Sequence, residues 1–515
     1  MTKALPVSAE VGVIGAGAMG AGIAQVAALA GHRVSLFDTG MGAADRAKLK
    51  LGETLAALAA KGKISEADAQ AAGARIVAVH ALGDFVSAKL VVEAIVEDLP
   101  IKCGLFRELE VIVTPDAILA TNTSSLSITA LAAGMKYPGR VAGMHFFNPA
   151  PLMPLVEVVS GLATDPDVAK SIYATALAWG KTPVHAQSTP GFIVNRCARP
   201  FYAEALRCVT ERATDPVTLD AIVREAGGFR MGPFELMDLI GLDINFAVTR
   251  SVWEAYFHDA RFTPSVLQQE MVAAGFLGRK AGRGFYDYGA NAVKPLASTE
   301  ASQSKPAKIA RHGELRLGAE LSARFAAAAI SVDAAPADAR FAQGAYRVTG
   351  SGDHCAWLVP GNGLTATEIA ARAGVRDLVT FDLAFDFATC TRLAVARADT
   401  CSDTAFTAVA GALQACGIAV SRVDDIAGLV VLRTVAMLAN EAADAVTQGI
   451  ASAADVDLAM QKGVNYPRGP LAWADALGIV FVRDVLQNLA LHYGEDRYRL
   501  SPLIARRCAS GGRLA

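Results

Sequence analysis

The sequence predicts an α/β architecture in which a parallel, doubly wound sheet and a helical domain are followed by a degenerate second copy of the same pair. Three observations support this fold class. Short apolar runs alternate with helical stretches through the first half, and the chain becomes almost entirely helical after about Pro190. Segments of the first half also recur at a constant distance, since 428 − 191 = 237 for one matching pair of glycines. Alternating elements are typical of parallel sheets covered by helices on both faces.

The first copy supplies the clearest strand and helix patterns. Short runs of Val, Ile, Leu and Ala predict buried strands, and apolar residues at helical spacing predict the helices between them. The expected strands are residues 11–14, 33–37, 90–95, 118–120 and 141–146, and the expected helices include residues 20–30 and 101–110.

The repeat and one composition change set the expected domain boundaries. Gly232-Pro233 falls on Gly469-Pro470, and 469 − 232 again gives 237. Residues 290–313 are rich in Ala, Ser, Lys and Pro and lack periodicity, which is typical of a linker. The sequence therefore predicts a sheet domain at 1–188, a helical domain at 189–289, a linker at 290–313, a second sheet domain at 314–423 and a second helical domain at 424–515.

The bulk composition excludes several classes of protein. The chain has 515 residues, of which 53% are hydrophobic and 19% charged, and its formal net charge is −2. These values are typical of a globular protein of several domains, and they favour neither nucleic acid nor a membrane as a partner. The eight cysteines form no CxxC pair, so we expect reduced thiols and no bound metal. No signal-peptide pattern and no membrane-spanning run is present, so we expect a cytoplasmic protein.

A glycine-rich turn after the first strand predicts a dinucleotide site. Gly15-Ala16-Gly17-Ala18-Met19-Gly20 follows an apolar strand and opens a helix. The three glycines allow a tight turn, a close approach of pyrophosphate and close packing of helix on strand. Asp38 ends the second strand, where a carboxylate binds ribose hydroxyls and repels a 2′-phosphate. The first sheet domain is therefore expected to be an NAD-binding Rossmann domain, and the second a degenerate Rossmann-like copy.

Three polar residues beside apolar strands suggest an acid–base site. His145 follows Gly143-Met144, Glu157 lies within Leu155-Val156-Glu157-Val158-Val159, and Asn195 follows Ile193-Val194. A charged group in a buried strand needs a partner, and a carboxylate next to an imidazole fixes the tautomer of the ring. Oxidation of an alcohol requires such a base, because the hydroxyl proton must leave as hydride departs.

Each of these residues also has a structural interpretation, and the repeat provides an internal control. A lone histidine is more often a core residue, and a lone strand glutamate is more often a packing contact. At the 237-residue shift, however, Glu157 falls on Ala394, Asn195 on Leu432 and His145 on or near Asp382. Residues needed only for folding should persist in both copies. Their loss favours a catalytic role in the first copy and predicts a catalytically silent second copy.

With these motifs, the first half resembles the (S)-3-hydroxyacyl-CoA dehydrogenase family. The resemblance spans about residues 11–288 and rests on the glycine loop and on five further segments: Val92-Glu93-Ala94-Ile95-Val96-Glu97, Asn122-Thr123-Ser124-Ser125-Leu126, His145-Phe146-Phe147-Asn148-Pro149, residues 190–196 and Met231-Gly232-Pro233-Phe234-Glu235-Leu236.

The resemblance implies a role for each matching position. It implies that His145 is the general base, that Glu157 is its partner, and that Ser124 and Asn195 bind substrate oxygens. The implied NAD contacts are Ser124, Glu97, Lys102, Asn148 and Lys280. The resemblance also implies that Thr54 and Lys61 lie along the CoA. This match rests on their spacing from Asp38, and a solvated helix end explains Lys61 and Lys63 equally well.

Four further segments extend the resemblance over nearly the full length: Asn148-Pro149-Ala150-Pro151-Leu152-Met153, Val158-Val159-Ser160-Gly161-Leu162-Ala163, Gly463-Val464-Asn465-Tyr466-Pro467 and His492-Tyr493-Gly494-Glu495-Asp496-Arg497-Tyr498. With them the whole chain resembles the long form of the family, the 3-hydroxyadipyl-CoA dehydrogenases of bacterial phenylacetate breakdown. This resemblance implies 3-oxoadipyl-CoA as the product, and Arg199 is then a candidate partner for the distal carboxylate; the alternative is a surface arginine. In the short forms the helical domain is a dimer interface, so the second helical domain is expected to pack within the chain. A homodimer of complete chains is left open.

Other functions stay open at this point. A 3-hydroxybutyryl-CoA or general short-chain 3-hydroxyacyl-CoA dehydrogenase would have the same motifs. A dehydrogenase of free hydroxy acids generally uses a helix-borne lysine, which the His145 and Glu157 pair disfavours. A non-catalytic NAD-binding protein would not need the three polar residues.

Overall fold

The computed structural model describes residues 3–350 and 354–515. The chain divides into two compact units, and each is built from both copies of the repeat. The first unit runs to Arg196 and includes residues 445–464, while the second contains residues 197–444 and 465–515.

The first unit contains an eight-stranded sheet with the strand order β3-β2-β1-β4-β5-β6-β7-β8. The β6–β7 pair is antiparallel, and the other neighbouring strands are parallel. The strands are β1 (Glu10–Ile14), β2 (Val34–Phe37), β3 (Ile76–Ala78), β4 (Ala88–Glu93), β5 (Ile118–Thr121), β6 (Val141–Phe146), β7 (Leu155–Ser160) and β8 (Thr182–Gln187). The predicted doubly wound sheet is therefore confirmed.

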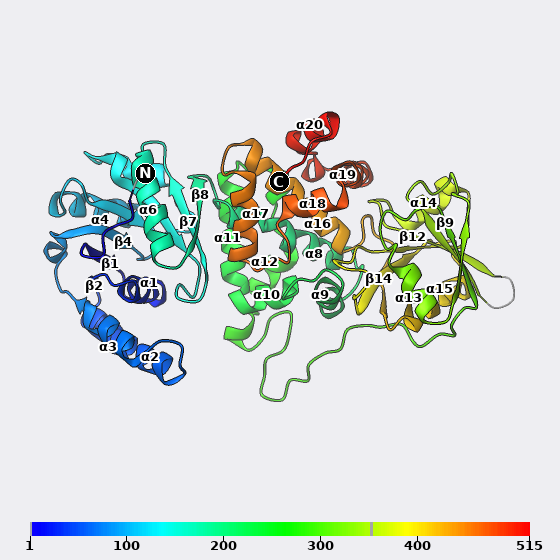
Figure 1. Cartoon of the computed structure of the whole chain (residues 1–515), viewed down its shortest axis with the longest axis horizontal. Coiled ribbons are helices and arrows are strands. Elements are labelled where there is room, and N and C mark those ends of the chain that lie inside the picture. The colour runs from blue at the N-terminus through cyan, green and yellow to red at the C-terminus, as the bar shows by residue number, and fades with distance from the viewer. Residues whose placement is uncertain (1–2, 351–353) are drawn as a thin grey trace. The chain divides into compact units, whose positions relative to one another are not determined.

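Helices cover this sheet because its strands are apolar on both faces. Residues of β1, β4 and β6 are almost wholly buried, as expected for central parallel strands. The helices are α1 (Ala18–Leu29), α2 (Ala43–Ala60), α3 (Glu66–Arg75), α4 (Leu99–Ile112), α5 (Ile128–Ala132), α6 (Pro166–Ala178) and α7 (Val194–Cys197), with short 3-10 turns η1 (Leu82–Phe85) and η2 (Pro138–Arg140). Figure 1 shows α2 and α3 side by side as a hairpin beyond β2.

The second unit combines a helical bundle with a seven-stranded sheet of the described residues, in the order β10-β9-β11-β12-β13-β14-β15. The bundle helices are α8 (Arg199–Thr210), α9 (Pro216–Glu225), α10 (Pro233–Ile240), α11 (Leu242–Ala255), α12 (Val266–Ala273), α16 (Val431–Thr447), α18 (Pro470–Leu477), α19 (Ile479–Tyr493) and α20 (Pro502–Ser510), with 3-10 turns η3 (Ala260–Phe262), η4 (Arg279–Ala281) and η6 (Asp496–Tyr498). None of the helices in the described part of the chain is long and apolar enough to cross a membrane.

The second sheet is a reduced and mixed version of the first. Its strands are β9 (Lys308–His312), β10 (Ser331–Ala335), β11 (Ala345–Thr349), β12 (Cys355–Pro360), β13 (Leu378–Phe381), β14 (Arg392–Arg397) and β15 (Ala419–Arg422). The helices α13 (Leu321–Ala327), α14 (Ala366–Ala373) and α15 (Asp403–Ala415) accompany them. Strand β11 runs antiparallel to both of its neighbours, so this part departs from a doubly wound sheet.

The repeat is visible in the element boundaries. Strand β14 spans the residues that the 237-residue shift assigns to β7, because 392 − 155 and 397 − 160 both equal 237. The pairing pattern is also kept: β13–β14 is antiparallel and β14–β15 parallel, as in β6–β7 and β7–β8. The turn before α7 recurs too, with positive φ at Phe192 (47°) and Leu429 (55°). The left-handed turn is therefore a requirement of the fold and not of one copy's chemistry.

The two copies exchange helices reciprocally. Helix α17 (Ala453–Gly463) of the second copy packs on β7 and β8 of the first sheet, and α9 of the first copy packs on β14 of the second sheet. The backbone joins them in the same way twice: Gln187 N donates to Ile450 O at 2.8 Å, and Asp424 N donates to Ala213 O at 2.8 Å. Both residue pairs are related by the repeat, since 424 − 187 and 450 − 213 equal 237.

Two features differ from the expected consecutive domains. The segment predicted as a linker, residues 290–313, ends in β9, which pairs with β10 and β11. The sequence shows no strand pattern for β9, because its residues are mostly polar and half-exposed and do not alternate between apolar and polar types. The second difference is the exchange itself, which places residues 445–464 with the first unit.

Candidate active site

The glycine loop connects β1 to α1 and leaves one side open. Gly15 has φ of 102°, and a Cβ there would lie 2.4 Å from Ala94 O. A Cβ on Gly20 would lie 1.8 Å from Gly15 O, whereas one on Gly17 would meet no described atom within 4 Å. Gly15 and Gly20 are thus required by the fold, and Gly17 leaves space at the N-terminus of α1, beside Ala18 and Met19. This space fits an approaching pyrophosphate, which helix N-termini bind through free N–H groups.

Asp38 shapes the same loop. Its Oδ2 accepts a hydrogen bond from Ala16 N at 2.7 Å, and its Oδ1 accepts one from Gly40 N at 2.8 Å. The carboxylate therefore stands at the carboxyl end of β2 with a fixed orientation. That position suits adenosine ribose hydroxyls, and its negative charge disfavours a 2′-phosphate.

The two glycines give a matched test of this loop. Gly17→Ala is expected to leave thermal stability nearly unchanged, because the new methyl group points into open space and φ of −69° suits alanine. It should weaken NAD binding about tenfold or more, which is at least about 1.4 kcal/mol. Gly20→Ala should instead lower the melting temperature, because its methyl group collides with the Gly15 carbonyl. Calorimetric NAD titration and thermal unfolding of both variants check this; equal NAD affinity in Gly17→Ala and the wild type would contradict it.

His145 and Glu157 form a buried pair across the antiparallel strands β6 and β7. They are directly opposite in the strand register, and His145 Nδ1 lies 2.7 Å from Glu157 Oε2. Glu157 is fully buried and His145 is 6% exposed. The ring also packs near Phe147 and Phe192, with centroid distances of 4.6 and 5.9 Å. Because a carboxylate accepts hydrogen bonds, Nδ1 carries the proton in this pair and Nε2 is the basic ring nitrogen.

The other oxygen of Glu157 holds the turn that carries Asn195. Glu157 Oε1 accepts hydrogen bonds from Ile193 N at 3.1 Å and Val194 N at 2.9 Å. Asn195 follows in α7, and its Nδ2 donates to Ser124 O at 3.4 Å. One carboxylate therefore contacts both the imidazole of His145 and the turn that precedes Asn195, and the structure brings the predicted residues His145, Glu157, Asn195 and Ser124 into one connected arrangement.

Glu97 organises the loop after β5. It accepts hydrogen bonds from Thr123 Oγ1 at 2.6 Å, Ser124 N at 3.1 Å and Ser125 Oγ at 3.0 Å. Burial alone would raise the pKa of Glu97, but these hydrogen bonds and the charge of Lys102 outweigh it, so its pKa lies below the ordinary value. Glu97 therefore remains ionised and fixes the backbone of Ser124.

Lys102 differs from a simple cofactor contact. Its side chain is 1% exposed, and its Nζ lies 2.5 Å from Glu93 Oε1 and 3.3 Å from Glu97 Oε2. Lys102 thus fixes Glu97, which is 38% exposed. The sequence pattern could not indicate this, because it does not show which side of α4 faces the sheet.

The remaining predicted residues are dispersed. Asn148 is exposed and precedes a cis proline, Pro149. Thr54 lies exposed on α2 and donates to Lys50 O at 2.8 Å, and Lys61 is the exposed residue that ends this helix. Lys280 belongs to the second unit, where its Nζ pairs with Asp243 at 2.6 Å.

Three supporting residues were missed from the sequence. Glu93 is fully buried at the end of β4, where it accepts from Ile95 N, Lys102 and Thr121. Asn122 Oδ1 accepts from Phe146 N at 2.8 Å, next to His145. Lys181 Nζ donates to Ala150 O at 2.5 Å and Met153 O at 3.0 Å, which fixes the loop after Asn148. The argument that identified Glu157, a charge in an apolar strand, would also have identified Glu93.

The second copy keeps a carboxylate acceptor for the matching turn but has no histidine–glutamate pair at the two matching positions. Asp382 stands at the position of His145 and Ala394 at that of Glu157, since 382 − 145 and 394 − 157 equal 237; Asp382 N donates to Ala394 O at 3.0 Å. The Asp382 carboxylate accepts directly from Val430 N at 3.0 Å, Val431 N at 2.7 Å and Leu432 N at 2.9 Å. These N–H groups are the repeat partners of those of Ile193, Val194 and Asn195.

Replacing Asp382 should therefore affect the fold and not the turnover. Asp382→Ala leaves three buried N–H groups without these acceptors, so we expect a loss of about 3 kcal/mol or more. In a unit or chain of this size, that corresponds to a melting temperature lower by about 3–5 °C. Asp382→Asn keeps one acceptor oxygen and should lose less. Thermal unfolding and kcat of folded enzyme check both effects; a large loss of kcat with unchanged stability would contradict this interpretation.

Comparisons with known proteins agree with this geometry. Residues 10–189 match the family model of the 3-hydroxyacyl-CoA dehydrogenase NAD binding domain, and residues 191–288 and 428–514 match the model of its C-terminal domain. The chain belongs to the 3-hydroxyacyl-CoA dehydrogenase family. It is thus an NAD-dependent oxidoreductase, and the two matches to one C-terminal model confirm the duplication. Residues 358–426 match the 3-hydroxybutyryl-CoA dehydrogenase reduced Rossmann-fold domain, as expected for a degenerate second sheet.

Relatives within this dehydrogenase family differ in length and in name. A 3-hydroxyadipyl-CoA dehydrogenase of Escherichia coli K12 is 42% identical over 96% of this chain and 97% of its own length. A crystal structure of a 3-hydroxybutyryl-CoA dehydrogenase from Escherichia coli K12 covers 98% of this chain and 100% of its own, with 40% identity and a TM-score of 0.88. A probable 3-hydroxybutyryl-CoA dehydrogenase of Deinococcus radiodurans is 45% identical but covers 54% of this chain and 99% of its own length.

Proposed function

We propose that this chain oxidises 3-hydroxyadipyl-CoA to 3-oxoadipyl-CoA, as one step of bacterial phenylacetate breakdown. The observation that carries the chemistry is the buried His145–Glu157 pair, joined through Glu157 to the turn of Asn195. The adipyl chain is supported by the 42% identity to a full-length relative of that name. The alternative is 3-hydroxybutyryl-CoA, the substrate in the name of the full-length solved structure.

In this proposal the proton and the hydride leave the substrate together. His145 Nε2 takes the proton of the C3 hydroxyl, and Glu157 stabilises the imidazolium that forms. Bound NAD supplies the acceptor for the C3 hydride. Asn195 and Ser124 hold the substrate oxygens, which reduces the entropy that the reaction must otherwise overcome.

The residues around this centre are proposed to bind cofactor and CoA. The loop Gly15–Gly20 and Asp38 hold the adenosine half of the cofactor, and Glu97, Ser124 and Asn148 face its nicotinamide half, with Lys102 fixing Glu97. Lys280 is proposed as a further cofactor contact. Thr54 lies on α2 and Lys61 caps the C-terminal end of this helix. Their separation of seven residues makes about two helical turns, and we propose that both side chains lie along the CoA.

We also propose a compartment and an assembly. The enzyme is proposed to act in the cytoplasm on a soluble acyl-CoA, with the second copy catalytically silent. The homodimer left open by the sequence is tested by sedimentation, where a species of two chains supports it and a species of one chain contradicts it.

The proposed substrate is tested by NADH formation with 3-hydroxyadipyl-CoA and 3-hydroxybutyryl-CoA side by side. A clearly higher kcat/KM for the adipyl substrate supports the proposal. Equal or reversed kcat/KM values would support the dehydrogenase activity but contradict the assignment of 3-hydroxyadipyl-CoA as the substrate. Turnover of neither substrate would contradict the proposed chemistry.

A further inference from the structure

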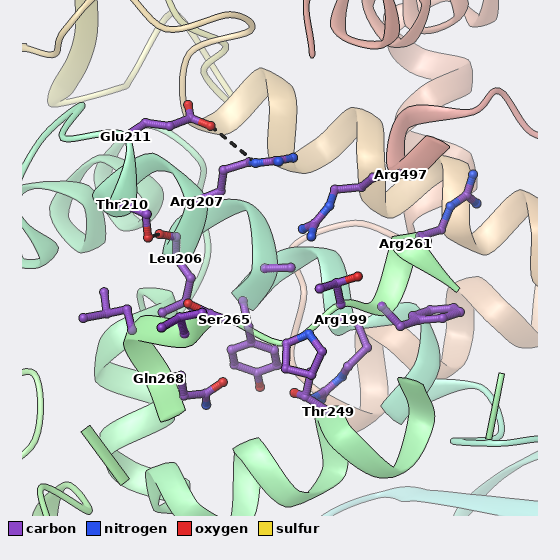
Figure 2. A pocket seen from close by; sticks show the side chains of 17 residues that line it. Arg199, Leu206, Arg207, Thr210, Glu211, Thr249, Arg261, Ser265, Gln268 and Arg497 are labelled. Atoms are coloured by element: carbon purple, nitrogen blue, oxygen red, sulfur yellow. Dashed lines mark hydrogen bonds and ion pairs between the residues drawn. The ribbon is translucent and has the colours of Figure 1, made fainter. Parts of the chain in front are cut away.

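The helical part of the second unit contains a cavity of about 340 Å³. It lies among α8, α11, η3 and α12, and Figure 2 shows side chains from these elements converging on it. Four of its lining side chains are arginines, Arg199, Arg207, Arg261 and Arg497, and one is the glutamate Glu211. Its volume lies at the lower end of the range of about 300–1,000 Å³ that small-molecule sites occupy.

Arg199 is the unusual member of this group. It is 5% exposed, so the alternative interpretation of a surface arginine is wrong. Its Nη1 donates to Thr249 Oγ1 at 2.9 Å, its guanidinium lies 4.9 Å from the ring centroid of Tyr202, and its Nε has no hydrogen-bond partner among the described residues. The side chain is thus buried with part of its hydrogen-bonding fork unused.

Each of the other three arginines of the cavity has at least one carboxylate partner, although Arg207 and Arg497 share Glu495. Arg207 pairs with Glu495 and Glu211, Arg261 with Glu441 and Asp444, and Arg497 with Glu495. Arg199 has no ion pair within residues 3–350 and 354–515, where its guanidinium bonds to the Thr249 hydroxyl. Burial consequently lowers the pKa of Arg199, yet an arginine remains charged at neutral pH.

The contacts of Arg199 do not compensate for its burial. Its cation–π contact with Tyr202 and its single hydrogen bond to the Thr249 hydroxyl are weak contacts. Moving an unpaired charge into the protein interior costs more free energy than such contacts return. An arginine fork beside an open cavity is well suited to a carboxylate, which it binds through two parallel hydrogen bonds.

We propose that this cavity is a carboxylate-binding site in which Arg199 pairs with the carboxylate of a small organic acid or of an acyl chain. Two sources share this chemistry. One is a free dicarboxylate that binds apart from the reaction. The other is the distal carboxylate of the substrate, a version that rests on the proposed function.

The site is tested with adipate as the probe and neutral adipamide as its control. Calorimetry measures binding of each to wild type, Arg199→Met, Arg199→Lys and Arg250→Met. Arg250 is an exposed residue of α11 that pairs with Glu254, so its variant controls for the loss of one positive charge. Arg199→Lys keeps the charge and should fold even where the Met variant does not. In parallel, kcat/KM is measured for 3-hydroxyadipyl-CoA and 3-hydroxybutyryl-CoA in each variant. The ratio of the two kcat/KM values does not change when a variant loses activity equally toward both substrates.

The expected result is that adipate binds wild type and Arg250→Met, binds at least tenfold more weakly to Arg199→Met and to a lesser extent to Arg199→Lys, and that adipamide does not bind. A fall of tenfold or more in the adipyl-to-butyryl ratio in the Arg199 variants assigns the carboxylate to the substrate. Loss of adipate binding with an unchanged ratio assigns it to a separate ligand. If adipate binding and the adipyl-to-butyryl ratio of kcat/KM are both unchanged in the Arg199 variants, the proposed carboxylate site is wrong. Failure of wild type to turn over either substrate contradicts the proposed function and leaves the adipate measurement to decide this site alone.

Discussion

A His145→Asn variant is expected to lose about 10²- to 10⁴-fold in kcat, the contribution of a positioned general base. The fold should survive, because the asparagine amide can replace Nδ1 as the donor to Glu157 Oε2, a bond of 2.7 Å in the wild type. Asparagine has no basic nitrogen at the position of Nε2, so the substrate hydroxyl keeps its proton. The variant therefore removes the basic nitrogen of His145 while it keeps the buried hydrogen bond to Glu157.

Three measurements check this result: kcat with saturating substrate, NAD affinity by calorimetry and the melting temperature. NAD affinity and melting temperature should stay close to those of the wild type. A kcat within a few-fold of the wild type would show that another group takes the proton. A large fall in melting temperature would mean that the ring packing against Phe147 and Phe192 dominates.

Two substitutions of Glu157 are expected to separate its effect on the His145 ring from its effect on the stability of the protein. Glu157→Gln can still accept from Ile193 N and Val194 N through its amide oxygen, but its NH₂ group would face His145 Nδ1. The ring must then accept at Nδ1 and carry its proton on Nε2, so it cannot act as a base. We expect a loss of about 10²- to 10⁴-fold in kcat with a small change in stability.

Glu157→Ala removes all three hydrogen bonds from a fully buried position. We expect a loss of about 3–5 kcal/mol of unfolding free energy, in addition to the loss of kcat. Thermal unfolding and steady-state kinetics of both variants check this. A Gln variant as unstable as the Ala variant would contradict the separation, and a Gln variant with nearly normal kcat would remove Glu157 from the mechanism.

The sequence predicted the sheet, the glycine loop and the His145–Glu157 pair because each leaves a local signal. A charged residue inside an apolar run must have a partner, and strand alternation limits which residues it can meet. The second copy strengthened the prediction, since Asp382 and Ala394 replace the pair at the shift that the structure confirms. These inferences need only the pattern of neighbouring residues and the constant 237-residue shift between the two copies.

Other features depend on contacts that no local pattern records. The burial of Lys102 between Glu93 and Glu97 depends on the rotation of α4 against the sheet. The burial of Arg199 depends on packing of α8 with residues some 50 positions away, such as Thr249. The reciprocal positions of α17 and α9 are likewise non-local, because either helix has the same amphipathic pattern wherever it packs. Sequence periodicity indicates that a helix must cover something, but not which sheet it covers.

The reciprocal exchange of α9 and α17 has a thermodynamic consequence. Two separate half-length chains that completed each other's sheets in this way would dissociate on dilution, because their association would be bimolecular. Covalent linkage makes the same event intramolecular, so the effective concentration of each partner no longer depends on the amount of protein. The second copy thus acts as a permanently attached partner, in which Asp382 anchors the turn at the start of α16.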